Sequence, residues 1–374
     1  MKMLKIAAVI LFALTGSFAW SAETIKIGLI NETTGPNAEA GSYAINGVKT
    51  AIEQINKKGG LLGKQVEVII EDTQSSNPGT VLAFSKLGGD KDIIAMIGPI
   101  RSTQVMAASP TIAKNAIPVM IGGTDPSLTH INNPWVFRCR PNDSFSSKVI
   151  ADFGVSTLKL KKWAIIHSTD TFGNGGKKAL EDALKLQGIT PVLTQGYTNN
   201  SQDFTPVVLA VKKSGADIVA SYMTNSTDVG ILAKQLRQLG ETSPWIGSTS
   251  ITTDTAITLA GEALYGTYGV TDFNADANAE SKAYSAMYRL KYKIEPDVYS
   301  GWTYDAINVL AQAITNANST NPEQIKKAIL ALKNFKGVEG NYNFDENGDG
   351  LSGYNIVKNE NGKLVFNKHI EFPK

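Results

Sequence analysis

Two loops, residues 97–103 and 121–124, carry the residue types that could hold a small anion. Each loop follows a run of apolar residues, so we expect each at the carboxyl end of a buried strand, where backbone N–H groups are free. A carboxylate between the loops would meet hydroxyl and N–H donors and a favourable helix-end field, worth roughly 0.3–1 kcal/mol per helix end. The alternative is that these hydroxyls only cap helices. The residues that we expect to contact a ligand are Ser102, Thr103, Gly122, Gly123 and Thr124.

A third loop, residues 170–176, superficially resembles a phosphate-binding loop because it contains three glycines. It matches neither G-x-G-x-x-G nor G-x-x-x-x-G-K-[ST]. We therefore expect a turn between a strand and a helix, in which Phe172 supplies an apolar wall to the pocket.

The segment Asp345–Gly350 matches the first half of a calcium-binding loop, with oxygen donors at positions 1, 3 and 5 and glycine at position 6. Position 12 is Ile356, where a calcium loop needs a glutamate. The composition is also that of an ordinary polar turn. We expect the turn, and no metal site.

Catalytic motifs are missing from the sequence. The histidines, His130, His167 and His369, are far apart, and neither H-E-x-x-H nor G-x-S-x-G occurs. Cys139 is the only cysteine, which leaves no internal disulfide and no cysteine-based zinc site. We expect no catalytic residue and no cofactor, and therefore no enzyme.

The elements that would position these loops alternate between strand and helix, as in a parallel sheet covered by crossover helices. In the first half, apolar residues between 44 and 55 recur at helical spacing and stop at Gly59-Gly60. The expected strands of this half are residues 25–30, 66–71, 93–97 and 117–121.

A second series of strands and helices begins after Asn142, and from Ala275 helices predominate. Three late helices cannot build a sheet of their own, so they must pack on an existing one and the chain must cross between lobes more than once. The expected strands are 163–167, 190–194, 217–222, 245–246, 354–358 and 363–366. The expected helices are 143–159, 172–187, 203–213, 227–239, 276–292, 299–316 and 322–333.

Length and charge limit the possible classes of protein. The chain has 374 residues, 42% of them hydrophobic, which favours two lobes of ordinary size. Its formal charge is +2, and this becomes zero if Lys2 and Lys5 are removed with a leader. A near-neutral surface without a basic cluster argues against nucleic acid or an anionic membrane as a partner.

The first 22 residues have the three-part pattern of a cleaved signal peptide. Lys2 and Lys5 are followed by the apolar stretch 6–14 and by small residues up to Ala22. This stretch is shorter than the roughly 20 residues that span a bilayer. No cysteine stands directly after the expected cleavage site, so we expect a soluble periplasmic protein without a lipid anchor.

A series of short motifs runs from Ile25 to about Phe366 in an order and spacing that resemble one known family. The motifs are Ile27-Gly28, Thr34-Gly-Pro36, Gly41, Gly47, Ile55-Asn-Lys-Lys-Gly-Gly60, Gly63, Glu71-Asp72, Gly98-Pro99, Ser102-Thr103, Gly122-Gly-Thr124, Phe172-Gly173, Asp203-Phe204, Gly261 and Gly266. Each is weak alone, but together they resemble the branched-chain-amino-acid type of periplasmic binding protein, the type I fold that serves ABC transporters.

The resemblance implies two doubly wound α/β lobes joined by a hinge of three strands. The expected lobes are residues 23–142 with 272–343, and residues 143–271 with 344–374. It further implies a monomer that closes on a small ligand and delivers it to an ABC permease. The ligand's carboxylate would be held by residues equivalent to Ser102, Gly123 and Thr124, and the second lobe would contribute Phe172, the segment Tyr222–Asn225 and Thr249.

The sequence departs from leucine-type relatives in two places. Those relatives have an acid near Thr249 for the ligand's ammonium, whereas residues 245–250 offer only hydroxyls. They often have an aromatic residue where this chain has Glu39-Ala-Gly41. Because an unpaired buried ammonium is costly, either Glu39 replaces the acid or the ligand is a carboxylate without an amine, such as an aromatic acid paired with Arg101. An amide ligand, and a ligand sensor for a signalling partner, remain alternatives.

Overall fold

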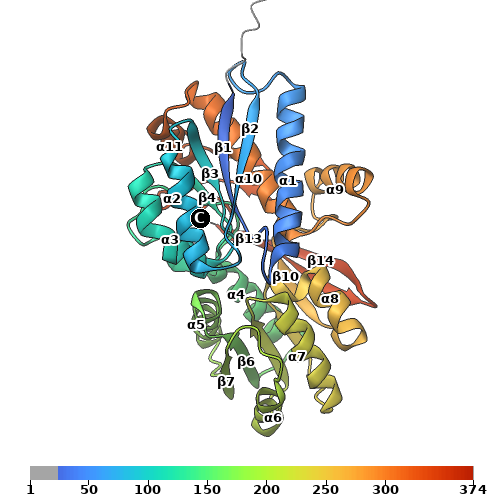
Figure 1. The fold of residues 1–374 in the computed structure, drawn as a ribbon. Helices are drawn as coiled ribbons and strands as arrows, with labels where there is room; N and C mark the ends of the chain where they lie inside the picture. Colours follow the sequence, from blue (N-terminus) through green and yellow to red (C-terminus); the bar gives the residue numbers. More distant parts are fainter. Residues whose placement is uncertain (1–23, 374) are drawn as a thin grey trace, which may run out of the picture.

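The computed structural model describes residues 24–373 and has two α/β lobes, one above the other in Figure 1. Lobe 1 is built on a five-stranded sheet with the strand order β2-β1-β3-β4-β5, and all of its strand pairs are parallel. Both faces of this sheet are covered, which explains the continuous apolar strand sequences. The strands are β1 (Ile25–Asn31), β2 (Val66–Asp72), β3 (Ile93–Ile97), β4 (Val119–Ile121) and β5 (Val136–Arg138).

Helices cover the two faces of the first sheet with separate apolar clusters. Ile27 and Leu29 of β1 point to one face, where they pack with α1 (Ala38–Lys57), α10 (Val298–Ala317) and α11 (Pro322–Leu330). Ile30 points to the other face. There α2 (Asn77–Gly89) and α3 (Ser102–Asn115) pack. A separate cluster rich in tyrosines joins α9 (Ala279–Tyr292) to α1 and α10.

Lobe 2 is built on a seven-stranded mixed sheet with the order β14-β13-β10-β9-β8-β6-β7. β13 is antiparallel to both of its neighbours, and the other pairs are parallel. The strands are β6 (Trp163–Ser168), β7 (Leu193–Tyr197), β8 (Ile218–Tyr222), β9 (Trp245–Gly247), β10 (Tyr268–Thr271), β13 (Gly353–Glu360) and β14 (Lys363–Glu371).

The helices of lobe 2 also form two layers. Trp163 and Ile165 of β6 pack with α4 (Asp143–Asp152) and α5 (Thr171–Leu186) on one face. The intervening residues of β6 pack on the opposite face with α6 (Thr205–Ser214), α7 (Ser226–Gln238) and α8 (Asp254–Ala260). The predicted doubly wound two-lobe class is therefore confirmed, with an antiparallel edge in lobe 2 that the prediction lacked.

Several predicted boundaries differ from the structure, and local reasons explain three of the differences. β7 begins at Leu193 instead of 190, because Pro191 has no N–H for a ladder. β4 begins at Val119, after Pro118, and not at 117. The helix predicted at 143–159 ends at Asp152 and continues as a π turn at Phe153–Thr157, where Gly154 leaves room for the ring of Trp163.

Between residues 24 and 373 the chain passes between the lobes three times: after β5, after β10, and after the short hairpin of β11 (Phe335–Lys336) and β12 (Asn341–Tyr342). We call these connections, residues 139–142, 272–278 and 343–352, the first, second and third crossings. The exact domain boundaries stay a prediction. Within residues 24–373 no helix is long and apolar enough to cross a membrane. The predicted signal peptide lies outside the described residues.

Candidate ligand-binding site

A cavity lies between the lobes, where the carboxyl ends of β3 and β4 face those of β8 and β9. The two walls touch, since the backbone N–H of Thr171 in α5 donates to the hydroxyl of Thr103 in α3 (N···O 3.3 Å). Eight of the residues predicted as ligand contacts meet in this cavity. They are Arg101, Ser102, Thr103, Thr124, Phe172, Met223, Thr224 and Thr249, and the remaining lining residues are Ile100, Arg140, Ser250 and Tyr299.

Ser102, the first residue of α3, ties the two loops of lobe 1 together. Its Oγ accepts hydrogen bonds from the backbone N–H groups of Thr124 and Asp125, both at 3.2 Å. The loops can approach this closely because residue 123 is glycine: a Cβ there would lie 3.1 Å from the Cα of Ser102. An oxygen that accepts twice still has its own hydrogen to donate. The Ser102 hydroxyl is therefore a candidate donor to a carboxylate in the cavity.

Thr124 is paired with a buried acid behind the cavity wall. Its hydroxyl donates to Asp143 Oδ2 (2.8 Å), and Asp143 is only 2% exposed. Burial raises the pKa of Asp143 to about 7, although the hydrogen bonds from Thr124 and Ser146 favour the charged form. A protonated Asp143 can donate to Thr124 instead, which would free the Thr124 hydroxyl to donate to a ligand.

Arg101 reaches across the cavity from lobe 1 to lobe 2. Its Nε lies 3.2 Å from both carboxylate oxygens of the buried Glu32, and its Nη1 donates to the carbonyl of Thr224 (2.7 Å). Within the described residues no hydrogen bond is formed by Nη2. Arg101 therefore bridges the lobes in this structure and keeps one edge of its guanidinium for another acceptor.

In the wall formed by lobe 2, Phe172 stands at the start of α5 and Tyr222 lies behind it. The two ring centroids are 5.9 Å apart, and the Tyr222 hydroxyl is bonded to Ser146 and Ser147, at 2.7 Å each. Tyr222 is fully buried and does not line the cavity. The lining positions of the predicted segment are the following two residues, Met223 and Thr224.

Asn225 and three other predicted contacts also lie outside the cavity lining. Gly122 and Gly123 form the backbone behind Ser102 and Thr124, and the Gly122 carbonyl accepts from Arg140 (3.1 Å). Glu39 is exposed near the start of α1, where it accepts a hydrogen bond from Thr255 of lobe 2. The predicted replacement of the missing acid by Glu39 therefore has no support in the geometry, because this carboxylate does not face the cavity.

The Glu39→Ala variant tests this placement. Because an exposed polar pair contributes little, we expect the dissociation constant for L-leucine, or for any solute that binds, to change less than threefold in isothermal titration calorimetry. A rise of the dissociation constant by more than tenfold would show that Glu39 contributes to ligand binding.

Some lining residues were not predicted from the sequence. Ile100 follows β3 and Ser250 follows β9, so the strand-end rule that selected Ser102 could have found both. Tyr299 comes from the start of α10, more than a hundred residues after the last predicted contact loop of lobe 1, and no local signal marks it.

The volume of the cavity indicates a closed state. It is about 50 Å³. A buried water needs roughly 10–15 Å³, so there is room for only about four waters. An amino acid or aromatic acid would require the lobes to part or Arg101 to move.

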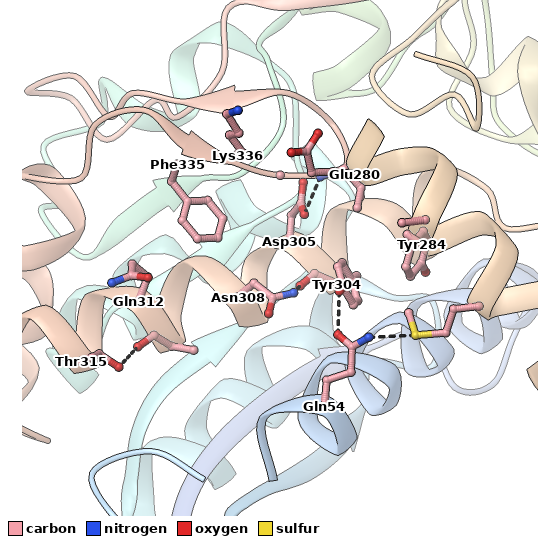
Figure 2. Close-up of a pocket in the computed structure, with 15 residues that line it drawn as sticks. Gln54, Glu280, Tyr284, Tyr304, Asp305, Asn308, Gln312, Thr315, Phe335 and Lys336 are labelled. Carbon is pink, nitrogen blue, oxygen red and sulfur yellow. Dashed lines mark hydrogen bonds between the residues drawn. The ribbon is translucent and has the colours of Figure 1, made fainter. Parts of the chain in front are cut away.

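A larger cavity of about 440 Å³ lies on the outside of lobe 1, between α1, α9, α10 and the β11 segment (Figure 2). Its polar groups are largely engaged with one another. Gln54 bonds to Tyr304 and Met287, and Asp305 accepts the N–H groups of Val338 and Glu339. This cavity lies within one lobe, so lobe closure would not act on it, and we place the candidate site between the lobes.

Two α/β lobes that meet around a polar cavity at their strand ends define a class of two-lobed solute-binding proteins. The chain belongs to the periplasmic binding protein family, whose profile matches residues 24–363. Proteins of this kind bind solutes and do not catalyse reactions, and the chain is accordingly not an enzyme.

Individual relatives cover almost the whole chain. The Leu/Ile/Val-binding protein homolog 1 of Brucella abortus (strain 2308) is 29% identical over 360 residues, which are 96% of this chain and 95% of that protein. The Leu/Ile/Val-binding protein BraC3 of Rhizobium johnstonii is 30% identical over 346 residues, 91% and 93% of the two chains. The crystal structure of the leucine binding protein LivK from Thermotoga maritima MSB8 superposes with a TM-score of 0.87 at 25% identity, over 93% of this chain and 99% of that one.

Proposed function

We propose that this protein is the exported solute-binding component of an ABC importer and that it captures a small carboxylate-bearing molecule by closure of its lobes. The observation that carries the proposal is the meeting of Ser102, Thr124 and Arg101 with Phe172 and Thr249 of the opposite lobe in one cavity. Hydroxyl and guanidinium donors on one wall suit a carboxylate, and the apolar groups suit a hydrophobic remainder.

A branched-chain amino acid is the first candidate ligand, because two relatives are named as Leu/Ile/Val-binding proteins and cover most of this chain. An amine-free acid is the second candidate. Among the described residues that line the cavity none is an aspartate or glutamate. The nearby Glu32 is already paired with Arg101, so an ammonium group would lack an anionic partner.

A thermal-shift experiment with matched solutes tests both the function and the ligand class. L-Leucine, 4-methylpentanoate and L-leucinamide share one carbon skeleton and differ in the amine and the carboxylate, and phenylalanine with 3-phenylpropionate forms an aromatic pair. A solute at about a hundred times its dissociation constant should stabilise the fold by roughly 2.7 kcal/mol.

We expect a carboxylate-bearing solute to raise the melting temperature and L-leucinamide to leave it unchanged. Preference for the amine-free partner of a pair would select the second candidate ligand. Stabilisation by none of the carboxylates would contradict the proposed function.

A further inference from the structure

Two buried arginines, Arg138 and Arg140, lie on either side of Cys139 where β5 enters the first crossing. Each is paired with a carboxylate from a different crossing. Arg138 Nε donates to Asp349 Oδ1 of the third crossing (2.7 Å), and Arg140 Nη2 donates to Asp272 Oδ1 of the second (3.0 Å). All four side chains are at most 7% exposed. The two ion pairs therefore join the end of β5 and the first crossing to the other two crossings.

The Nη1 groups of both arginines bind the loop of residues 122–125. Arg140 Nη1 donates to the Gly122 carbonyl (3.1 Å), and Arg138 Nη1 donates to the carbonyls of Gly123 (3.3 Å) and Asp125 (2.6 Å). The Thr124 carbonyl accepts from the backbone N–H of Asp143 (2.8 Å). Four successive carbonyls are thus held by residues 138–143, while the amides of residues 124 and 125 point to Ser102.

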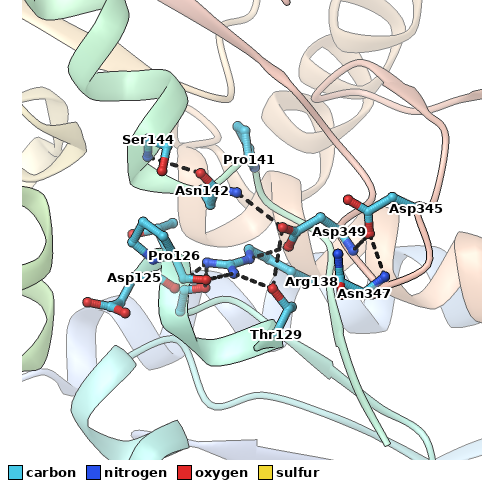
Figure 3. A network of polar contacts seen from close by, with 12 residues as sticks. Asp125, Pro126, Thr129, Arg138, Pro141, Asn142, Ser144, Asp345, Asn347 and Asp349 are labelled. Atoms are coloured by element: carbon cyan, nitrogen blue, oxygen red, sulfur yellow. Dashed lines mark hydrogen bonds and ion pairs between the residues drawn. The ribbon is translucent and has the colours of Figure 1, made fainter. Parts of the chain in front are cut away.

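Asp349 is itself fixed by the polar turn that resembled a calcium loop (Figure 3). Asp345 Oδ1 accepts the backbone N–H groups of Asn347 (3.0 Å) and Asp349 (2.9 Å). The second oxygen of Asp349 accepts from Asn142 (3.1 Å). Asp349, which is the acid at position 5 of the calcium-loop motif, therefore binds the guanidinium of Arg138.

We propose that Arg138 and Arg140 are positioning residues that hold the loop of residues 122–125 in its ligand-binding shape and link that shape to the hinge. A guanidinium suits this role because its planar set of donors fixes several acceptors at once. Any bending of the second or third crossing moves Asp272 or Asp349, and through the arginines it moves the loop. The inference rests on the proposed function only where it assumes that this loop holds the solute.

Hydrogen–deuterium exchange of residues 121–128 in the solute-free protein tests the linkage. The variants are Asp349→Asn and Asp272→Asn, together with the milder Thr129→Val, which removes the hydroxyl that accepts from Arg138 Nη2 (3.0 Å). The matched control is Asp228→Asn, an acid of lobe 2 that is 1% exposed and bonds to residues 200 and 225.

We expect exchange in residues 121–128 to accelerate at least tenfold in both acid variants and about threefold in Thr129→Val, at a temperature where every variant is folded. In Asp228→Asn the exchange rate of residues 121–128 should stay within twofold of that in the original protein. Unchanged exchange in Thr129→Val and in the acid variants that fold would overturn the linkage.

Binding of L-leucine and 4-methylpentanoate to the same variants separates this inference from the proposed function. Where either solute binds, its dissociation constant should rise at least tenfold in Asp349→Asn and not in Asp228→Asn. An equal rise in both variants would indicate general destabilisation and overturn the positioning role. If neither solute binds, the exchange measurement still decides the linkage.

Discussion

Replacement of Ser102 by alanine should weaken solute binding about a hundredfold while the protein stays folded. The variant removes the hydroxyl donor to the carboxylate and leaves the N–H groups of Thr124 and Asp125 without their acceptor. A charge-assisted hydrogen bond is worth roughly 1.5–3 kcal/mol, and every 1.4 kcal/mol is a factor of ten in affinity. Titration calorimetry with the best solute of the matched panel measures the loss.

Ser85→Ala is the control for Ser102→Ala. Ser85 is an exposed serine of α2 that donates to the Val81 carbonyl within its own helix. Its replacement should leave the dissociation constant unchanged within twofold. A Ser102→Ala protein that retains its affinity within threefold would show that this hydroxyl does not hold the ligand.

Replacement of Asp143 by asparagine should remove a large part of the pH dependence of stability. The pKa of Asp143 is raised by burial to about 7 in the folded protein, against about 3.9 in an unfolded chain. The folded state thus binds the proton more tightly, so this group's contribution to stability is full below about pH 4 and is lost as the pH rises towards 7. At 1.36 kcal/mol per pKa unit the loss approaches about 4 kcal/mol.

The measurement is the free energy of unfolding by urea at several pH values without solute. Between pH 4 and pH 8 the original protein should lose up to about 4 kcal/mol relative to Asp143→Asn, because the asparagine does not titrate. Asp152→Asn, an exposed change at the end of the same helix, should follow the original protein. Parallel curves for Asp143→Asn and the original protein would mean that Asp143 is ionised throughout this range.

The fold could be predicted from the sequence because its strongest signals are local. β3 is a continuous apolar run, and α1 has helical spacing of its buried residues up to the Gly59-Gly60 stop. β10 was not predicted, because Tyr268–Thr271 is short and contains a glycine. Only its pairing with β9 and β13 defines it as a strand. Such pairing joins residues that are far apart in the chain.

The cavity wall of lobe 1 was predictable for the same reason, since Ser102 and Thr124 lie shortly after the ends of β3 and β4. Glu39 lies outside the cavity lining, because its acidic type is visible in the sequence but the direction of its side chain is not. The roles of Arg138 and Asp349 depend on a contact across 211 positions. The sequence near Asp349 indicated only a turn, because Arg138, whose guanidinium Asp349 binds, is far away in the chain.

The most direct test of binding between the lobes is a crystal structure of the protein with the tightest-binding carboxylate of the matched panel. We predict that the solute lies between the lobes, with its carboxylate within about 3 Å of the Ser102 hydroxyl, the usual hydrogen-bond distance, and Phe172 beside its apolar part. A solute bound instead in the cavity between α1, α9 and α10, or a carboxylate that points away from residues 102 and 122–124, would contradict this prediction.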